Sequence, residues 1–224
     1  MSEGMSNAIV KRSAKAFFTF GRYQPPTIGH FSLIAQMLTQ GEAHGADTYV
    51  FASSKHEPGS IASRWPLNVG TKYEIFKKRY PDSATIGVIT TAPTAFAAVD
   101  LLKAAGYTDI TAFFGSDQVY PSAENPRPLG QALSKAKAGE IPVKVVAVIR
   151  DQAMGNTPVG MSGTKMRQAA AVSNLPRFAA GLNMSPNNAI PYMSTLRTSM
   201  GLPAGGTRSL RHTKQKKRRQ TRRR

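Results

Sequence analysis

Short apolar segments alternate with segments of helical periodicity through the first two thirds of the chain. We expect five strands, at residues 14–21, 47–54, 84–91, 109–117 and 142–150, and four intervening helices, at residues 30–45, 69–80, 95–106 and 129–139. Strands that alternate with helices form βαβ units, which build a parallel sheet covered by helices on both faces. The pattern predicts a Rossmann-like α/β domain with five parallel strands. The most continuously apolar of them, 142–150, is expected at the centre.

The charge is concentrated at the end of the chain. We expect an N-terminal arm over 1–13, the α/β domain over 14–182, short helices and a linker over 183–207, and a basic tail over 208–224. The tail holds ten of the 30 Lys and Arg residues and none of the 12 acidic residues, so the net charge without it falls from +18 to +8. We expect this tail to be disordered when free and to bind nucleic acid or an acidic protein. A purely solubilising tail is the alternative.

Composition excludes several classes of site. The chain contains no cysteine, which excludes disulfides, thiolate metal sites and a cysteine nucleophile. No apolar segment has the length of a transmembrane helix, and the N-terminal residues lack the apolar block of a signal peptide. We therefore expect a soluble, intracellular protein.

The segment GRYQPPTIGH, residues 21–30, connects the first predicted strand to the first predicted helix. Ligands of parallel sheets bind beyond the carboxyl ends of the strands, where this loop lies. Gly21 allows the backbone to turn tightly, and Thr27 is expected to cap the helix, whose exposed N–H groups favour a phosphate. His30 falls in the first helical turn, where its imidazole can donate to a phosphate oxygen. A simple helix cap beside an uninvolved histidine is the alternative.

A second segment with phosphate-binding character, MSGTKMR at residues 161–167, follows the fifth predicted strand and opens another helix. Ser162 and Thr164 can cap that helix and bind phosphate oxygens. Arg167 lies one turn further on, and its guanidinium can make paired hydrogen bonds to phosphate. Taken alone, helix capping explains the hydroxyls equally well.

Together the two segments resemble the signatures of the nucleotidyltransferase superfamily, which includes nicotinamide mononucleotide adenylyltransferase, cytidylyltransferases and phosphopantetheine adenylyltransferase. GRYQPPTIGH is similar to the Thr-x-Gly-His signature after the first strand, and MSGTKMR to the Ile-Ser-x-Thr-x-x-Arg signature after the fifth. The Gly-Arg-aromatic-Gln-Pro lead-in is typical of the nicotinamide mononucleotide branch. The resemblance covers residues 14–182 and leaves the tail outside.

This resemblance implies a reaction in which a phosphate of an acceptor attacks the α-phosphorus of ATP or CTP and pyrophosphate leaves. It implies catalytic roles for His30, Thr27 and Arg167. The nucleotide is expected to contact Gly21, Arg22, Gly29, Asp117, Ser162 and Thr164. Mg²⁺ is expected to arrive with the triphosphate, because no cluster of carboxylates suggests a metal site built by the protein. The favoured acceptor is nicotinamide mononucleotide.

Residues 53–76 are similar to the acceptor region of that branch, which carries Asn-Pro-Phe-x-x-Gly-Glu-Arg. The proline, the glycine and a basic residue match, whereas Trp65 replaces the asparagine and Thr71 the glutamate. We therefore consider Lys55, Trp65 and Lys72 as acceptor-binding residues. The alternatives are solvated surface cations for the two lysines and a core or lid position for Trp65, and another acceptor stays open.

A function of a different class also stays open. The fold would then serve as a scaffold, while residues 208–224 bind nucleic acid or a packaged assembly. Similar basic tails occur on proteins of large DNA viruses, and similar signatures occur in phage and viral nucleotidyltransferases, so a viral source and a place in the virion are further expectations. The presence of both His30 and Arg167 favours an active enzyme.

Overall fold

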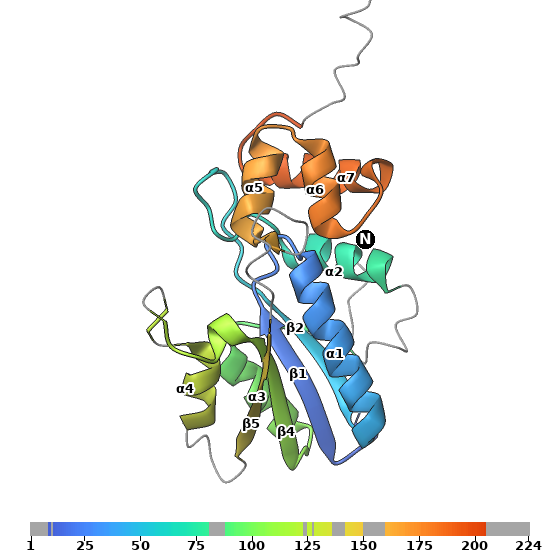
Figure 1. Ribbon diagram of the computed structural model, residues 1–224, viewed down its shortest axis with the longest axis vertical. Helices are drawn as coiled ribbons and strands as arrows, with labels where there is room; N and C mark the ends of the chain where they lie inside the picture. The colour runs from blue at the N-terminus through green and yellow to red at the C-terminus, as the bar shows by residue number, and fades with distance from the viewer. Residues whose placement is uncertain are drawn as a thin grey trace, which may run out of the picture.

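The computed structural model describes residues 9, 11–80, 88–122, 125–126, 128–135, 142–149 and 160–204. Five parallel strands form one sheet: β1 (Lys15–Gly21), β2 (Asp47–Ser53), β3 (Val88–Ala92), β4 (Asp109–Gly115) and β5 (Val143–Val148). The helices are α1 (Ile28–His44), α2 (Val69–Arg79), α3 (Ala95–Ala104), α4 (Leu129–Lys135), α5 (Gly163–Ala171), α6 (Leu175–Leu182) and α7 (Pro186–Ser199). A 3₁₀ turn, η1 (Ser116–Gln118), follows β4. The Rossmann-like α/β fold is confirmed (Figure 1).

Helices cover both faces of the sheet because the side chains of each strand alternate between two cores. On the central strand β1, Phe17 belongs to the core that also contains residues of α1, α2, α5, α6 and α7, while Phe18 belongs to the core that contains residues of α3 and α4. Successive residues of a strand point to opposite faces, so a strand buried on both sides is apolar throughout. This explains the continuous apolar runs by which the strands were predicted.

The lateral order of the strands is β3-β2-β1-β4-β5, so the expectation that 142–150 forms the central strand is wrong. β5 lies at an edge of the described sheet, beside β4, and β1 is central. The valines of β5 are nevertheless shared between the two cores, Val148 on one face and Val143 on the other. Burial on both faces makes an edge strand as apolar as a central one. Residues 84–87, 136–139 and 150 of the predicted elements lie outside the described residues.

The region expected to hold short helices and a linker, 183–207, contains α7 as one helix of 14 residues. Its apolar residues Ala189, Met193 and Leu196 are buried in the same core as residues of α1 and β1. Packing therefore continues beyond residue 182. Residues 205–224, including the whole basic tail, lie outside the described residues.

Arg197 of α7 holds the C-terminal end of α5. Its side chain is almost fully buried, with 8% of the residue exposed, and its Nη1 donates to the carbonyl oxygens of Ala170 (2.6 Å) and Ala171 (2.8 Å). The last carbonyls of a helix have no partner within the helix, so the guanidinium acts as a side-chain cap. Nε of Arg197 also donates to the carbonyl oxygen of Pro203 (3.0 Å). Arg197 thus links the C-terminal end of α5 to α7 and to Pro203, and these contacts help to fix the position of α5.

The described part of the N-terminal arm packs at the amino end of the sheet. The backbone N–H groups of Arg12 and Ser13 donate to Oδ2 of Asp47, at 2.7 and 2.9 Å. The hydroxyl of buried Tyr107 donates to the same oxygen (2.7 Å). These bonds lie at the end of the sheet opposite to the loops that follow the strands.

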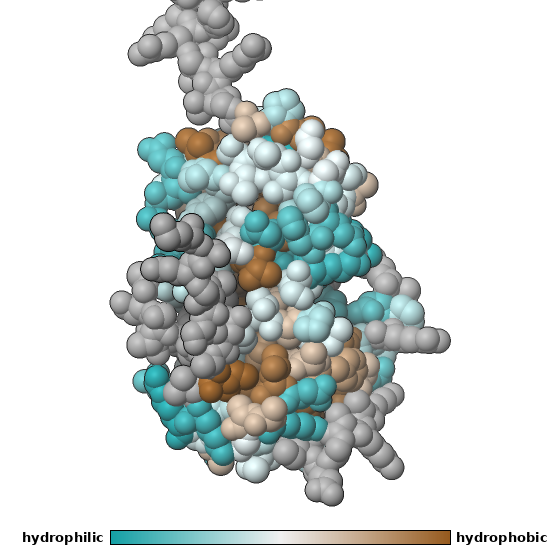
Figure 2. All heavy atoms as spheres, turned by 180° about the vertical axis from the view of Figure 1, so that it is seen from behind, coloured by the Kyte–Doolittle hydropathy of each residue, from teal (hydrophilic) through white to brown (hydrophobic). Residues whose placement is uncertain are grey.

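The face seen in Figure 2 lies behind that of Figure 1, and apolar side chains gather in its lower half. On α3, Phe96 and Leu101 are among the large apolar residues that remain exposed. No helix within the described ranges has both the length and the apolarity needed to cross a bilayer.

Candidate functional site

A cavity of about 600 Å³ opens at the carboxyl ends of β1 and β4. The two strands are neighbours, but the chain continues from β1 to β2 on one side and from β4 to β5 on the other. Open α/β sheets bind ligands at such a reversal of strand order, and the volume suits a small-molecule ligand. Nine expected residues line the cavity: Gly21, Arg22, Thr27, Gly29, His30, Asp117, Ser162, Thr164 and Arg167.

The loop between β1 and α1 is folded tightly around Tyr23. This buried residue has a positive φ of 49°, and its ring stands edge-on to the rings of His30 and Phe76, with centroids 5.0 and 4.9 Å away. A Cβ atom at Gly21 would lie 2.6 Å from the Tyr23 ring. The loop therefore requires a glycine at position 21, because the tyrosine folds back against it.

Thr27 is the N-cap of α1, as predicted, and it also orients His30. The backbone N–H of Thr27 donates to Nδ1 of His30 (3.0 Å), and the Thr27 hydroxyl lies 2.8 Å from the same nitrogen. A backbone N–H can only donate, so Nδ1 acts as an acceptor and the neutral ring carries its proton on Nε2. His30 is thereby held as a hydrogen-bond donor through Nε2.

Gln24 ties this loop to the segment that follows β2. Its Oε1 accepts from the backbone N–H of Leu67 (2.7 Å), and its Nε2 donates to the carbonyl oxygen of the same residue (2.9 Å). Both side chains are buried. This reciprocal pair leaves no polar atom of the Gln24 amide group without a bond and fixes the separation of the two loops.

The second predicted motif contacts the first directly. Ser162 is the N-cap of α5, and its hydroxyl accepts from the backbone N–H of Lys165 (3.2 Å). Arg167 donates through Nη1 to the carbonyl oxygen of Gln24 (2.9 Å) and through Nη2 to the hydroxyl of Thr164 (3.1 Å). A Cβ atom at Gly163 would lie only 3.0 Å from the Gln24 carbonyl oxygen. The missing side chain at Gly163 therefore permits the close approach of α5 to the loop.

Positive charge dominates the cavity wall. Arg22, Arg64 and Arg167 line it from three separate segments, and Asp117 is the single acid among the described lining residues. Partial burial, followed by the charge of Arg64, lowers the pKa of Arg22. Burial, followed by the charges of Arg22 and Arg64, lowers the pKa of Arg167. Guanidinium groups that repel one another in a shared cavity favour a bound anion.

Asp117 lies on η1, at the end of β4. Its Oδ2 accepts from Nε2 of Gln118 (3.1 Å), and its carbonyl oxygen accepts from Nδ2 of Asn125 (2.9 Å). Asp117 thus lines the cavity from the end of β4. No group of three or more His, Asp or Glu side chains in the described ranges is arranged to hold a metal ion.

The three residues considered for the acceptor do not line the cavity. Lys72 has no exposed surface, and its Nζ donates to the carbonyl oxygen of Ser53 (2.6 Å). Burial lowers the pKa of Lys72 from 10.5 to about 8. The structure thus corrects both the acceptor-binding and the surface interpretation of Lys72: this ammonium belongs to the core beneath the end of β2.

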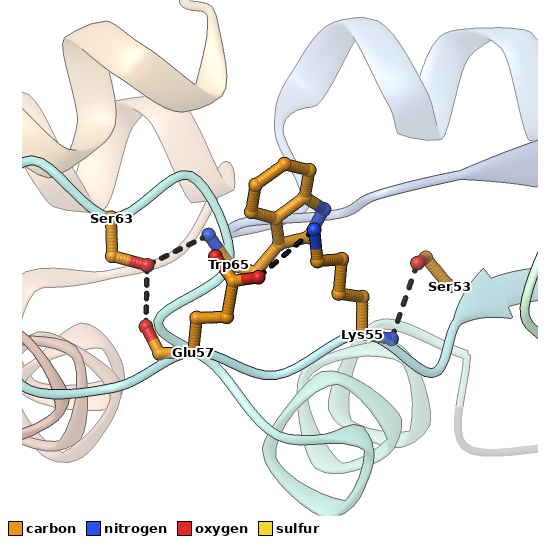
Figure 3. A network of polar contacts seen from close by, with 5 residues as sticks. All are labelled: Ser53, Lys55, Glu57, Ser63 and Trp65. Carbon is orange, nitrogen blue, oxygen red and sulfur yellow. Dashed lines mark hydrogen bonds and ion pairs between the residues drawn. The ribbon is translucent and has the colours of Figure 1, made fainter.

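Lys55 and Trp65 pair with each other, as Figure 3 shows. Nζ of Lys55 lies 3.7 Å from the centroid of the Trp65 rings and forms an ion pair with Glu57 (2.9 Å). One face of the indole is therefore covered by an ammonium group. Lys55 is half-exposed in this arrangement rather than fully solvated.

Four polar residues of the cavity wall were not among the residues expected from the sequence: Tyr23, Gln24, Arg64 and Lys165. Tyr23, Gln24 and Lys165 lie inside the two motifs, where their identity is visible but their contacts are not. Arg64 has no motif or periodicity of its own, although it lies within residues 53–76, next to Trp65. Its place in the cavity follows from the path of an irregular loop.

No protein-family model matches the sequence, and no curated protein matches it either. The structure is similar to that of a protein from Streptococcus pneumoniae described as a macrolide-efflux protein, with a TM-score of 0.50, 17% identity and coverage of 79% of this chain and 57% of the other. It is also similar to nicotinic acid mononucleotide adenylyltransferase from Plasmodium falciparum complexed with APC, with a TM-score of 0.51, 9% identity and coverage of 80% and 94%. At these identities the likeness concerns the fold. The chain has the fold of a solved adenylyltransferase and spans little more than half of the streptococcal chain.

Proposed function

We propose that the chain is a nucleotidyltransferase, which transfers a nucleoside monophosphate from ATP or CTP to a phosphorylated acceptor and releases pyrophosphate. Nicotinamide mononucleotide with ATP is the favoured pair. One observation carries the proposal: the two segments that are expected to bind phosphate meet at a single cationic cavity, where Arg167 of the second bonds to Gln24 of the first. The fold shared with an adenylyltransferase that was solved with APC supports the same class of reaction.

In this reaction an oxygen of the acceptor phosphate forms a bond to the α-phosphorus. The bond from that phosphorus to the pyrophosphate oxygen breaks, and its electron pair leaves with pyrophosphate. No covalent enzyme intermediate is required, so the protein accelerates the step by positioning two anions and stabilising the developing charge.

The described contacts suggest a role for each part of the wall. His30, with Nδ1 occupied by Thr27, donates from Nε2 to an α-phosphate oxygen. The N-terminus of α5, with Ser162 and Thr164, holds the β and γ phosphates, and Arg167 stabilises the departing pyrophosphate. Gly21 and Gly29 line the cavity where the nucleotide is proposed to lie, and Asp117 binds a ribose hydroxyl or a base edge.

Mg²⁺ is proposed to enter as part of the triphosphate substrate. Triphosphate oxygens supply ligands that this cation prefers, and the described cavity offers one carboxylate, Asp117, near them. The cation would neutralise phosphate charge, while the residues named above bind and orient the anions.

The decisive experiment measures pyrophosphate release with Mg²⁺ and ATP or CTP, against a panel of phosphorylated acceptors led by nicotinamide mononucleotide. We expect release with at least one pair and a fall in kcat of about 10²- to 10³-fold in His30→Ala, since it loses a donor to the transition state. Release with a pair other than nicotinamide mononucleotide and ATP would change the substrate and keep the reaction. Absence of release by the folded wild-type protein with every pair would refute the proposal.

A second function is favoured by the charge of the tail, in which ten of seventeen residues are Lys or Arg. We propose that residues 208–224 bind nucleic acid or an acidic partner, either to localise the enzyme or as the main activity of a scaffold. Deletion of 208–224 should abolish salt-sensitive binding to DNA and leave pyrophosphate release intact. Loss of turnover in the folded deletion variant would contradict this division of roles.

A further inference from the structure

The loop between β2 and α2, residues 54–68, is attached to the rest of the fold at three places. At its start, the backbone N–H of Lys55 donates to Oγ of Ser53 (3.3 Å). At its tip, the N–H of Gly59 donates to the carbonyl oxygen of Ser199, at the end of α7 (2.7 Å). At its end, Leu67 is held by Gln24 of the β1–α1 loop. Long irregular loops within compact domains are usually functional, and this one is held in a defined position.

A network within the loop holds the two neighbours of Arg64 (Figure 3). The N–H of Trp65 donates to Oγ of Ser63 (3.1 Å), the hydroxyl of Ser63 donates to the carbonyl oxygen of Glu57, and the N–H of Glu57 donates to the carbonyl oxygen of Trp65 (2.8 Å). The ammonium of Lys55 completes the network by lying over the indole and pairing with Glu57. The backbone on both sides of Arg64 is therefore fixed by side chains that do not line the cavity.

Arg64 itself lines the cavity together with Arg22, which comes from the β1–α1 loop. The charge of Arg64 is felt at Arg22, so the two guanidinium groups are close enough to repel each other. Neither arginine has a hydrogen-bond or ion-pair partner within the described ranges, whereas Arg167 is already bonded to Gln24 and Thr164. Arg64 does lie over the Trp65 ring, with Cζ 5.9 Å from its centroid, but this contact leaves the N–H groups unused. Two such guanidinium groups from separate loops suit a doubly charged phosphate, which accepts paired hydrogen bonds from each.

We propose that Arg64 and Arg22 bind the phosphate monoester of the acceptor, and that Trp65 and Lys55 position Arg64 instead of stacking on the ligand. This inference rests on the proposed nucleotidyltransferase function and specifies its acceptor as a phosphate monoester. The acceptor phosphate then lies on the side of the β1–α1 and β2–α2 loops, and the leaving pyrophosphate on the side of α5. The two anions are held by different arginines.

Substitution of Arg64 by glutamine distinguishes binding of the acceptor from binding of ATP. We expect KM for nicotinamide mononucleotide to rise about 10- to 100-fold, which is the effect of losing a hydrogen bond between charged groups, and KM for ATP to change less than threefold. Arg177→Gln, which removes an exposed arginine of α6 outside the cavity, is the matched control. An unchanged KM for the acceptor, or an equal rise for ATP, would overturn the assignment of Arg64.

The positioning role of Trp65 is tested with two probes, nicotinamide mononucleotide and ribose 5-phosphate, which lacks the aromatic base. Trp65→Ala should weaken the binding of both by the same factor, should add nothing in the Arg64→Gln background, and should be rescued largely by Trp65→Phe, which keeps a ring beneath Lys55. Weakened binding of nicotinamide mononucleotide alone would show that Trp65 stacks on the base, and would overturn the positioning role.

Equilibrium binding distinguishes failure of this inference from failure of the proposed function. Calorimetric titration of nicotinamide mononucleotide and of inorganic pyrophosphate requires no turnover. If the wild-type protein releases no pyrophosphate but binds nicotinamide mononucleotide more tightly than Arg64→Gln does, the reaction is refuted and the phosphate site stands. If the wild-type protein releases pyrophosphate and Arg64→Gln binds nicotinamide mononucleotide and inorganic pyrophosphate as tightly as wild type does, the site is refuted and the reaction stands. Absence of any phosphate-monoester binding to wild type would refute the site.

Discussion

Lys72 provides a quantitative test of how the core beneath the cavity is built. The side chain has no exposed surface, and its ammonium donates to the carbonyl oxygen of Ser53. Burial lowers the pKa of Lys72 from 10.5 to about 8, a difference of about 2.5 units. One unit corresponds to about 1.4 kcal/mol, so keeping this lysine charged in the native state costs about 3 kcal/mol relative to the unfolded chain.

The sign of the pH dependence follows from these two values. Below pH 8 both states are protonated and the full cost is present. Between about pH 8 and 10.5 the native state has released the proton and the unfolded state has not, so stability rises with pH and the cost disappears. A methionine at this position would carry no such cost, although it would give up the bond to Ser53, worth about 1 kcal/mol.

Urea denaturation of wild type and Lys72→Met from pH 7 to pH 10 measures this difference. At pH 7 we expect the variant to be more stable by about 1–3 kcal/mol, and the advantage to vanish as the pH approaches 10. The comparison of two proteins at each pH cancels the titration of groups that they share. A difference in unfolding free energy that does not change with pH would refute the reasoning, because it would mean that Lys72 has the same pKa in both states.

Two further predictions concern the position of α5. Gly163→Ala should cost about 1–3 kcal/mol in unfolding free energy and lower kcat/KM for pyrophosphate release at least tenfold, because its Cβ would press against the Gln24 carbonyl oxygen at 3.0 Å. Gly70→Ala, whose Cβ would make an ordinary contact at 3.6 Å, is the control and should be neutral or slightly stabilising in the same denaturation assay. Arg197→Gln should cost about 1–3 kcal/mol and speed amide exchange in α5, since the Ala171 carbonyl loses its donor and the Ala170 carbonyl is left with the backbone N–H of Ser173; unchanged exchange in α5 would show that this cap is dispensable.

The elements of the fold were predictable because their signals are local. Each strand buried on both faces is a short apolar run, and several helices have a local N-cap, as Thr27 and Ser162 illustrate. The lateral order of the strands was not predictable in this way, because it depends on which connection crosses to which side. β5 shows the limit: its apolar run reports burial on two faces and says nothing about the number of neighbouring strands.

The same distinction applies to the site. The motif residues could be placed at the carboxyl end of the sheet because each motif comes between a strand and the helix after it. Arg64 could not, because its position depends on bonds from Gly59 and Leu67 to other parts of the chain. Lys72 was misplaced for a related reason: a lysine is expected at the surface, and the burial of its ammonium depends on the Ser53 carbonyl group, which lies far from it in sequence.

The cap that Arg197 places on α5 has a consequence for the order in which the protein assembles during synthesis. β1, β2 and the loop with Arg64 precede α5 in the chain and leave the ribosome before it, although a domain generally folds as a unit. α5 follows much later and is secured only when Arg197 has been made. The wall that carries Arg167 is therefore secured only after α7 has been synthesised. A chain that stops before α7 would contain all three arginines of the cavity and would lack the cap that holds α5 in place.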